Sequence, residues 1–211
     1  MPAWSADGAW VYLLAQRGGG VDLLRAAVDG SAVETVIAGE DAHTEQFALA
    51  PDAAHVYMLR CDPTHPWDIW EQAAGGAATR ALTQVNAALL DERLLTQPER
   101  FAYASFDGWR IEGWLYRPAH APTPGAPLAL KIHGGPHGAY GQTFFLSVQA
   151  LVGLGYAVLY VNPRGSVGYG EAFAQACDHD WGGGDYQDIL AGVDAALARG
   201  FSISVSGIAT F

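Results

Sequence analysis

The chain has 211 residues, 50% of them hydrophobic and 16% charged, so it can bury a sizeable core. Its formal net charge of −11 disfavours nucleic acids and anionic membrane surfaces as partners, because both would repel an acidic protein. No apolar run approaches the ~18 residues that a membrane-spanning helix needs.

Residues 1–85 contain an internal repeat of β-prone runs. Residues 9–14 match residues 54–59, which lie 45 positions later, and Asp7 matches Asp52 at the same spacing. Turn residues separate the runs in both copies. A period of about 40–50 residues with this content is typical of β-propeller blades. We therefore predict a partial β-propeller of about two blades, the alternative being two unrelated pairs of hairpins.

Residues 86–100 are predicted to connect this repeat to a second domain at residues 101–211. The connection has weak helical spacing of its apolar residues, and Pro98 argues against a helix that continues into it. The second domain opens with two β-prone runs on either side of Asp107-Gly108, which is a strong hairpin signal.

Strand-like and helix-like segments then alternate. Apolar runs at residues 128–132 and 156–161 predict two buried strands. Residues 144–152 place apolar side chains on one helical face, residues 171–176 suggest a short helix, and Asp185 is the predicted cap of a longer helix. This order predicts an α/β domain with a parallel sheet.

Each apolar strand stops at a glycine-rich turn. The first is followed by HGGPH at residues 133–137, and the second by NPRGSVGYG at residues 162–170. Such turns form the mouths of active sites in open α/β sheets, and glycine lets the backbone approach a ligand and offer it N–H groups. We treat residues 133–137 as a candidate site, the alternative being a tight turn without a ligand.

These motifs resemble those of the prolyl oligopeptidase family of serine peptidases, particularly its acylaminoacyl-peptidase and dipeptidyl-aminopeptidase branches. The resemblance also includes DGWRIEGW at residues 107–114 and DWGGGD at residues 180–185, in the same order and spacing. It implies that residues 101–211 form the N-terminal half of an α/β-hydrolase sheet. It also implies that residues 1–85 are the last two or so blades of a β-propeller.

The resemblance further implies hydrolysis of short peptides through an acyl-enzyme. A serine attacks the peptide carbonyl, a histidine accepts its proton and an aspartate orients the histidine. One oxyanion-hole donor of this fold is a backbone N–H in the loop after the third strand. By position that donor falls within residues 133–136, with Gly135 as the first candidate and Gly134 as the second.

Other chemistry is disfavoured in this region. Arg164 could contact a substrate carboxylate, but a structural arginine that bonds nearby loops is the preferred interpretation. The glycines at residues 165–170 and 182–184 do not have the order of a nucleotide-binding loop. Neither His-Glu-x-x-His nor paired cysteines occur, so we expect no metal and no cofactor.

The family pattern breaks after Gly200. The nucleophile should lie in Gly-x-Ser-x-Gly, which occurs nowhere in the chain, and Ser206 lacks the flanking glycines. We expect the triad aspartate and histidine, which follow the nucleophile in this fold, to be absent as well. We interpret the chain as a fragment, left by an altered reading frame or a premature stop, the alternative being a genuine short variant. We expect it to be inactive alone and to expose strand edges that promote aggregation.

Two other functions stay open. One is a non-catalytic pseudo-enzyme or binding module, for which a stable, monodisperse fold would be evidence. The other is a carboxylesterase-type α/β-hydrolase, which shares the His-Gly-Gly turn. Two cysteines are too few for a disulfide framework, and the first residues lack the regions of a signal peptide, so we expect a cytoplasmic protein.

Overall fold

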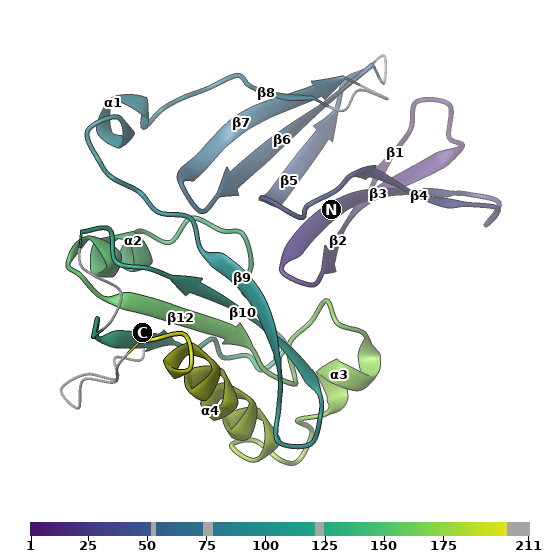
Figure 1. The fold of residues 1–211 in the computed structure, drawn as a ribbon. Coiled ribbons are helices and arrows are strands. Elements are labelled where there is room, and N and C mark those ends of the chain that lie inside the picture. The colour runs from purple at the N-terminus through teal and green to yellow at the C-terminus, as the bar shows by residue number, and fades with distance from the viewer. Residues whose placement is uncertain (52–53, 74–77, 121–124, 202–211) are drawn as a thin grey trace. The chain divides into compact units, whose positions relative to one another are not determined.

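The computed structural model describes residues 1–51, 54–73, 78–120 and 125–201 (Figure 1). The chain divides into two compact units. The first holds Met1–Glu92 together with Gly141–Phe144, and the second holds Arg93–Tyr140 and Phe145–Phe211. Within the described ranges, no helix is both long enough and apolar enough to cross a membrane.

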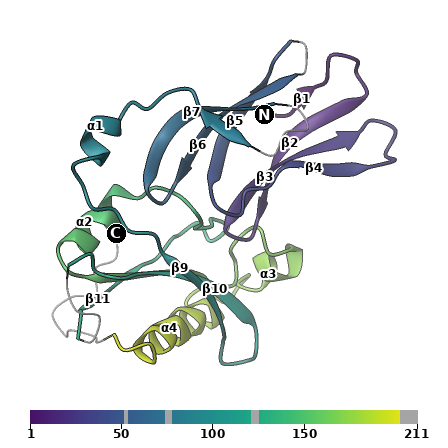
Figure 2. The same cartoon turned by 45° about the horizontal axis from the view of Figure 1, so that its top comes forward.

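The first unit contains two four-stranded antiparallel sheets, with strand orders β1-β2-β3-β4 and β5-β6-β7-β8 (Figure 2). In each sheet, strands that follow one another in sequence are also neighbours in space. The strands are Ala3–Trp4 (β1), Trp10–Arg17 (β2), Gly20–Ala27 (β3), Val33–Ile37 (β4), His43–Leu49 (β5), His55–Asp62 (β6), His65–Ala73 (β7) and Thr79–Ala81 (β8).

The sequence repeat corresponds to these two sheets, because β2 and β6 begin 45 positions apart. An aspartate on the third strand of each sheet fixes the chain just after the fourth strand. Asp22 Oδ1 accepts the N–H of Gly39 at 2.8 Å. Asp68 Oδ1 accepts the N–H of Val85 at 3.1 Å and the hydroxyl of Thr83 at 2.5 Å. Each copy of the repeat therefore has hydrogen bonds that tie its third strand to the segment after its fourth strand, and we call them closing bonds.

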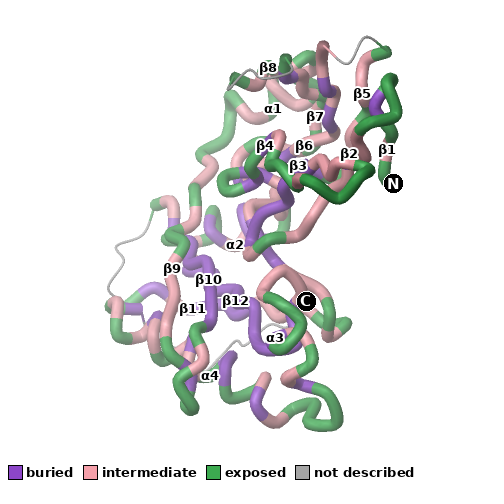
Figure 3. The backbone as a smooth tube through the Cα atoms, turned by 90° about the vertical axis from the view of Figure 1, so that its right-hand side faces the viewer, coloured by how far each residue is buried: buried purple, intermediate pink, exposed green. Residues whose placement is uncertain are grey.

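The apolar core of the first unit draws on both sheets. Leu23 of β3 and both Val56 and Met58 of β6 belong to one hydrophobic cluster, and Figure 3 shows buried segments in both sheets. Burial of this kind is the main stabilising contribution for sheets that pack against each other. The cluster consists of Tyr12, Leu23, Ile37, Val56 and Met58.

The second unit contains a four-stranded sheet with the order β9-β10-β12-β11. Its strands are Glu99–Ala104 (β9), Arg110–Tyr116 (β10), Leu128–Lys131 (β11) and Ala157–Asn162 (β12). The parallel pairing expected of the two apolar strands is confirmed for β11 and β12, but the sheet as a whole is not parallel. The β9–β10 and β10–β12 pairs are antiparallel, and only β11 and β12 are parallel. The sheet is mixed because the predicted hairpin is part of it, and two strands joined by a tight turn must run in opposite directions.

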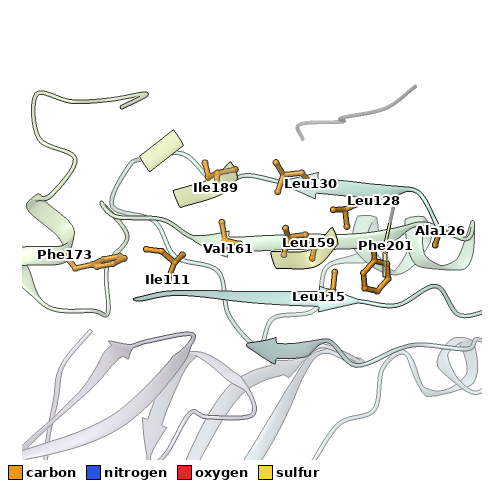
Figure 4. Packing of buried hydrophobic residues seen from close by; sticks show 12 residues of the cluster. Ile111, Leu115, Ala126, Leu128, Leu130, Leu159, Val161, Phe173, Ile189 and Phe201 are labelled. Atoms are coloured by element: carbon orange, nitrogen blue, oxygen red, sulfur yellow. The ribbon is translucent and has the colours of Figure 1, made fainter. Parts of the chain in front are cut away.

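Helices cover both faces of this sheet. Successive strand residues point to opposite faces, so Trp114 and Tyr160 pack with α2 (Leu146–Gly153), and Ile111 and Leu159 pack with α4 (Gly184–Leu197). Figure 4 shows the second group, in which Ile189 of α4 lies over the strands. The full burial of β12, predicted from its apolar run, is confirmed. The shorter helices are α1 (Ala87–Leu90) and α3 (Glu171–Gln175).

The N-terminus of α4 differs from the expectation. Asp185 lies inside the first turn rather than at the cap position. Instead, Asp180 Oδ2 accepts the N–H of Gly184, the first residue of the helix, at 2.9 Å. A Cβ at Gly183 would overlap the Asp180 carboxylate, so glycine at that position leaves room for this bond.

The α4 helix approaches the sheet closely at Gly192. A Cβ there would lie 2.5 Å from the hydroxyl oxygen of Tyr103, which donates a hydrogen bond to the Asp188 carbonyl at 2.7 Å. We expect Gly192→Ala to destabilise the protein by about 1–3 kcal/mol through overpacking, although alanine favours helices. The matched control is Gly153→Ala in α2, where nothing lies within 4 Å and a gain of up to about 1 kcal/mol is expected. Equal urea midpoints for the two variants would contradict this account.

Candidate active site

The chain turns sharply after β11, at residues 132–138. Gly135 has a φ of +134°, in the region that favours glycine, and a Cβ there would lie 3.0 Å from the backbone nitrogens of His137 and Gly138. Gly134 and Gly135 are both exposed. In the part of the chain that the structure describes, neither backbone N–H donates a hydrogen bond. The turn therefore presents two unused backbone donors.

These donors line a pocket of about 250 Å³ at the carboxyl ends of β11 and β12. In open α/β sheets this end of the strands is where ligands bind. Both apolar and charged side chains complete the lining, so the pocket could hold a chain with apolar and polar groups. They are Ile132, His133, Pro136, Pro163, Arg164, Trp181, Asp185 and Ile189.

Two histidines attach the glycine turn to the loop that follows β12. Nε2 of His133 lies 3.0 Å from Ser166 Oγ, and Nδ1 of His137 lies 3.0 Å from the carbonyl oxygen of Gly165. Burial lowers the pKa of His133, so its ring is neutral near pH 7. The two loops that form the pocket are therefore held together by hydrogen bonds on both sides of the glycines.

Arg164 follows β12, and its side chain is only 8% exposed. Nε and Nη2 donate to Asp188 at 2.9 and 2.8 Å, and Nη1 and Nη2 donate to Asp107 at 2.8 and 2.9 Å. These hydrogen bonds raise the pKa of the Arg164 guanidinium. The rings of Phe106 and Trp109 lie 4.9 and 5.6 Å from the guanidinium carbon. All three guanidinium nitrogens are thus occupied, and the interpretation of Arg164 as structural is confirmed.

Asn162, the last residue of β12, holds the far end of the glycine loop. Its amide accepts the N–H of Tyr140 at 2.7 Å and donates to the Tyr140 carbonyl at 2.9 Å. It also donates to the hydroxyl of Tyr169, which donates in turn to Glu112 at 2.6 Å. The loop of residues 132–140 is therefore fixed at both ends by side chains that follow β12 or end it.

The structure thus places the two predicted oxyanion-hole candidates in one turn, beside a pocket. Ser206 lies outside the described residues. Among the described residues, no group of three or more His, Cys, Asp or Glu could hold a metal ion. Asp188 and Asn162 were not singled out from the sequence, although a carboxylate on the apolar face of α4 is a signal that it has a buried cationic partner.

Comparisons with known proteins agree with this arrangement. The profile of the prolyl oligopeptidase family matches residues 142–210. A peptidase of Bacillus subtilis named YuxL, itself uncharacterised, is 36% identical over 199 residues, which are 94% of this chain and 30% of that protein. The chain belongs to the prolyl oligopeptidase family.

Other relatives lie in the same family branches. Dipeptidyl-peptidase 5 of Schizosaccharomyces pombe is 31% identical over 123 residues, which are 53% of this chain and 18% of that protein. The uncomplexed acylaminoacyl peptidase of Pyrococcus horikoshii superimposes with a TM-score of 0.80 at 29% identity, covering 91% of this chain and 29% of that one. The chain therefore spans less than a third of the length of these family members.

The thiol beside the site is expected to be unreactive. Cys177 is fully buried, a Cβ at Gly165 would lie 2.5 Å from its sulfur, and burial raises its pKa. Burial raises the pKa of the second thiol, Cys61, to about 12. Because the thiolate is the reactive form, we expect neither cysteine to react with a maleimide until urea unfolds the chain. Mass spectrometry of the native protein would test this, and rapid labelling of Cys177 would contradict its burial.

Proposed function

We propose that this chain forms part of the catalytic domain of a serine peptidase that cleaves short peptides through an acyl-enzyme. In this proposal the backbone N–H of Gly135 stabilises the oxyanion of the tetrahedral intermediate. The observation that carries the proposal is that Gly135 is exposed and lines a pocket, and that its backbone N–H donates no hydrogen bond to any described residue, in a chain of a peptidase family. A fixed donor of this kind acts where negative charge develops and needs no reorganisation during the reaction.

In this proposal the catalytic serine, histidine and aspartate are supplied by polypeptide that is not part of the 211-residue sequence. The sequence has no Gly-x-Ser-x-Gly, so the 211-residue chain is proposed to be inactive by itself. The two four-stranded sheets of the first unit are proposed to be blades of a β-propeller. Their order, their repeat and the closing bonds of Asp22 and Asp68 support this proposal.

A chimera tests the function. Residues 1–200 would be joined to the part of the Bacillus subtilis relative that follows its matched segment. We expect the chimera to release p-nitroaniline from aminoacyl or acylaminoacyl p-nitroanilides and to react with a peptidyl chloromethyl ketone. The 211-residue chain should do neither.

The outcomes distinguish the alternatives. Hydrolysis of aryl esters by the chimera without cleavage of any anilide would favour an esterase. A folded chimera that cleaves neither class of substrate would contradict the assignment of residues 1–200 to a catalytic domain. Cleavage by the 211-residue chain itself would show that its catalytic groups are already present.

A further inference from the structure

The two sheets of the first unit pack against each other through one apolar cluster. The first sheet contributes Tyr12 and Leu23, with Leu14 partly buried against the cluster. The second sheet contributes Val56 and Met58. Successive residues of a strand point to opposite faces, so each of these two sets lies on a single face of its sheet. The cluster therefore identifies the face that each sheet uses in this interface.

The sequence repeat shows that the two sheets use different faces. At the repeat spacing of 45 residues, Tyr12 corresponds to Tyr57 and Leu14 to Leu59. Tyr57 and Leu59 alternate with Met58 along β6, so they lie on the face of the second sheet that points away from the cluster. The interface is therefore heterologous, because it joins one face of the first sheet to the other face of the second. It leaves one face of each kind unused.

The unused face of the second sheet is apolar and open. We call it the Tyr57 face and define it as Tyr57, Leu59 and Ile69 with their neighbours on the same side of β5 and β6. Leu59 and Ile69 form a cross-strand pair, as do their counterparts in the first sheet. Ile69 is 39% exposed, and the three side chains line a groove of about 170 Å³. The groove lies at the repeat position of the face with which the first sheet packs on its neighbour.

The unused face of the first sheet has the complementary character. Val11 and Leu13 of β2 occupy the repeat positions of the two β6 residues in the cluster. Trp4 is paired with Val11, and Val33 is paired with Ala26 on the same face. Trp4 and Val33 are 64% and 69% exposed. We call this surface the Val11 face, and large exposed apolar side chains that share one face indicate an interaction surface.

We propose that the Tyr57 face of one molecule binds the Val11 face of a second copy of this chain. The contact repeats the one inside the first unit, with tyrosine, leucine and isoleucine on one side and valine and leucine on the other. Each copy has one face of each kind, so association continues beyond a dimer unless it closes into a ring. The inference rests on the packing of the first unit and not on the proposed peptidase function.

The first experiment is sedimentation velocity of the 211-residue chain over a series of concentrations. We expect its mass to rise with concentration beyond that of a dimer. Ile69→Glu and Val33→Glu should each give a monomer, because a charge without a partner is costly to bury in an apolar interface. The matched control is Leu89→Glu in α1, which changes a residue that is 53% exposed and belongs to neither face. It should associate like the unmodified chain.

The second experiment mixes the two monomeric variants. Val33→Glu keeps its Tyr57 face and Ile69→Glu keeps its Val11 face, so an equimolar mixture should form a dimer and nothing larger. Circular dichroism checks that each variant keeps its sheets. Ala48→Glu and Trp4→Glu form a second pair, because each changes an exposed residue of one face. They should behave in the same way.

The other outcomes would overturn the proposal. An unmodified chain that stays monomeric at every concentration would show that the two faces do not bind each other. A dimer of Val33→Glu alone would indicate that two Tyr57 faces pair symmetrically. Association that persists in all the variants would indicate that exposed strand edges are responsible. A mixture that stays monomeric, although both variants are folded, would exclude the head-to-tail contact.

Discussion

Gly135→Ala is expected to lower kcat of the chimera by roughly 10²–10³-fold, equivalent to about 2.7–4 kcal/mol of transition-state stabilisation. Alanine rarely adopts a φ of +134°, and its Cβ would lie 3.0 Å from two backbone nitrogens, so the turn must change shape. The N–H would then leave the position where the oxyanion forms. KM should change little, because the donor acts mainly in the transition state.

Gly134→Ala is the matched control one residue earlier. A Cβ at Gly134 meets nothing within 4 Å, so this variant should retain kcat within a few-fold. The pair also separates the two candidate donors from each other. A large loss in Gly134→Ala with little effect in Gly135→Ala would transfer the role to Gly134. Similar losses of kcat in both variants would indicate that catalysis depends on the shape of the whole turn and not on one N–H group.

Arg164→Ala is expected to cost about 3–5 kcal/mol of unfolding free energy, the typical loss when one partner of a buried ion pair is removed. The reason is that Asp188 is fully buried and would keep its charge without the guanidinium, or else take up a proton. Arg164→Lys should recover little of this loss, because one ammonium cannot replace three nitrogens shared by two carboxylates. Urea unfolding, with hydrogen exchange of the α4 amides, would measure the loss.

Arg117→Ala is the control for this effect. Arg117 pairs with Glu99 at 2.9 Å in the same unit, but both side chains are more than 40% exposed. Solvent screens such a pair, so its removal should change stability by less than about 1 kcal/mol. If Arg164→Ala were no more destabilising than Arg117→Ala, the buried network would contribute nothing beyond a surface ion pair.

Much of the second unit could be predicted from short-range patterns. The Asp107-Gly108 hairpin, the buried strand that became β12 and the short α3 helix each depend on residues close in sequence, and each is present. The glycine turn could be predicted for the same reason. The apolar run that precedes HGGPH locates the turn, and the two glycines indicate that its backbone can approach a ligand. These features need no knowledge of the rest of the fold.

The remainder depends on pairings between distant residues. The order of the strands in the sheet depends on where β12 inserts, between β10 and β11, and no local pattern encodes that order. The partners of Arg164 come from a hairpin turn 57 residues earlier and a helix 24 residues later. The cap of α4 was assigned to the wrong aspartate because Asp180 reaches it through a glycine turn. The sequence pattern could single out a charged or capping residue, but it could not identify the distant residue to which that residue bonds.

The closing bonds of the first unit define where this chain could be divided into modules. Residues 41–86 contain all of β5 to β8, together with Asp68 and both residues that it fixes. A duplication with those boundaries would add a sheet that carries its own closing bond. A boundary between Asp68 and Thr83 would leave one copy without its aspartate and the other without its partner. An array of such sheets could therefore lengthen by whole units during evolution, or in the laboratory, at boundaries near residues 40 and 86.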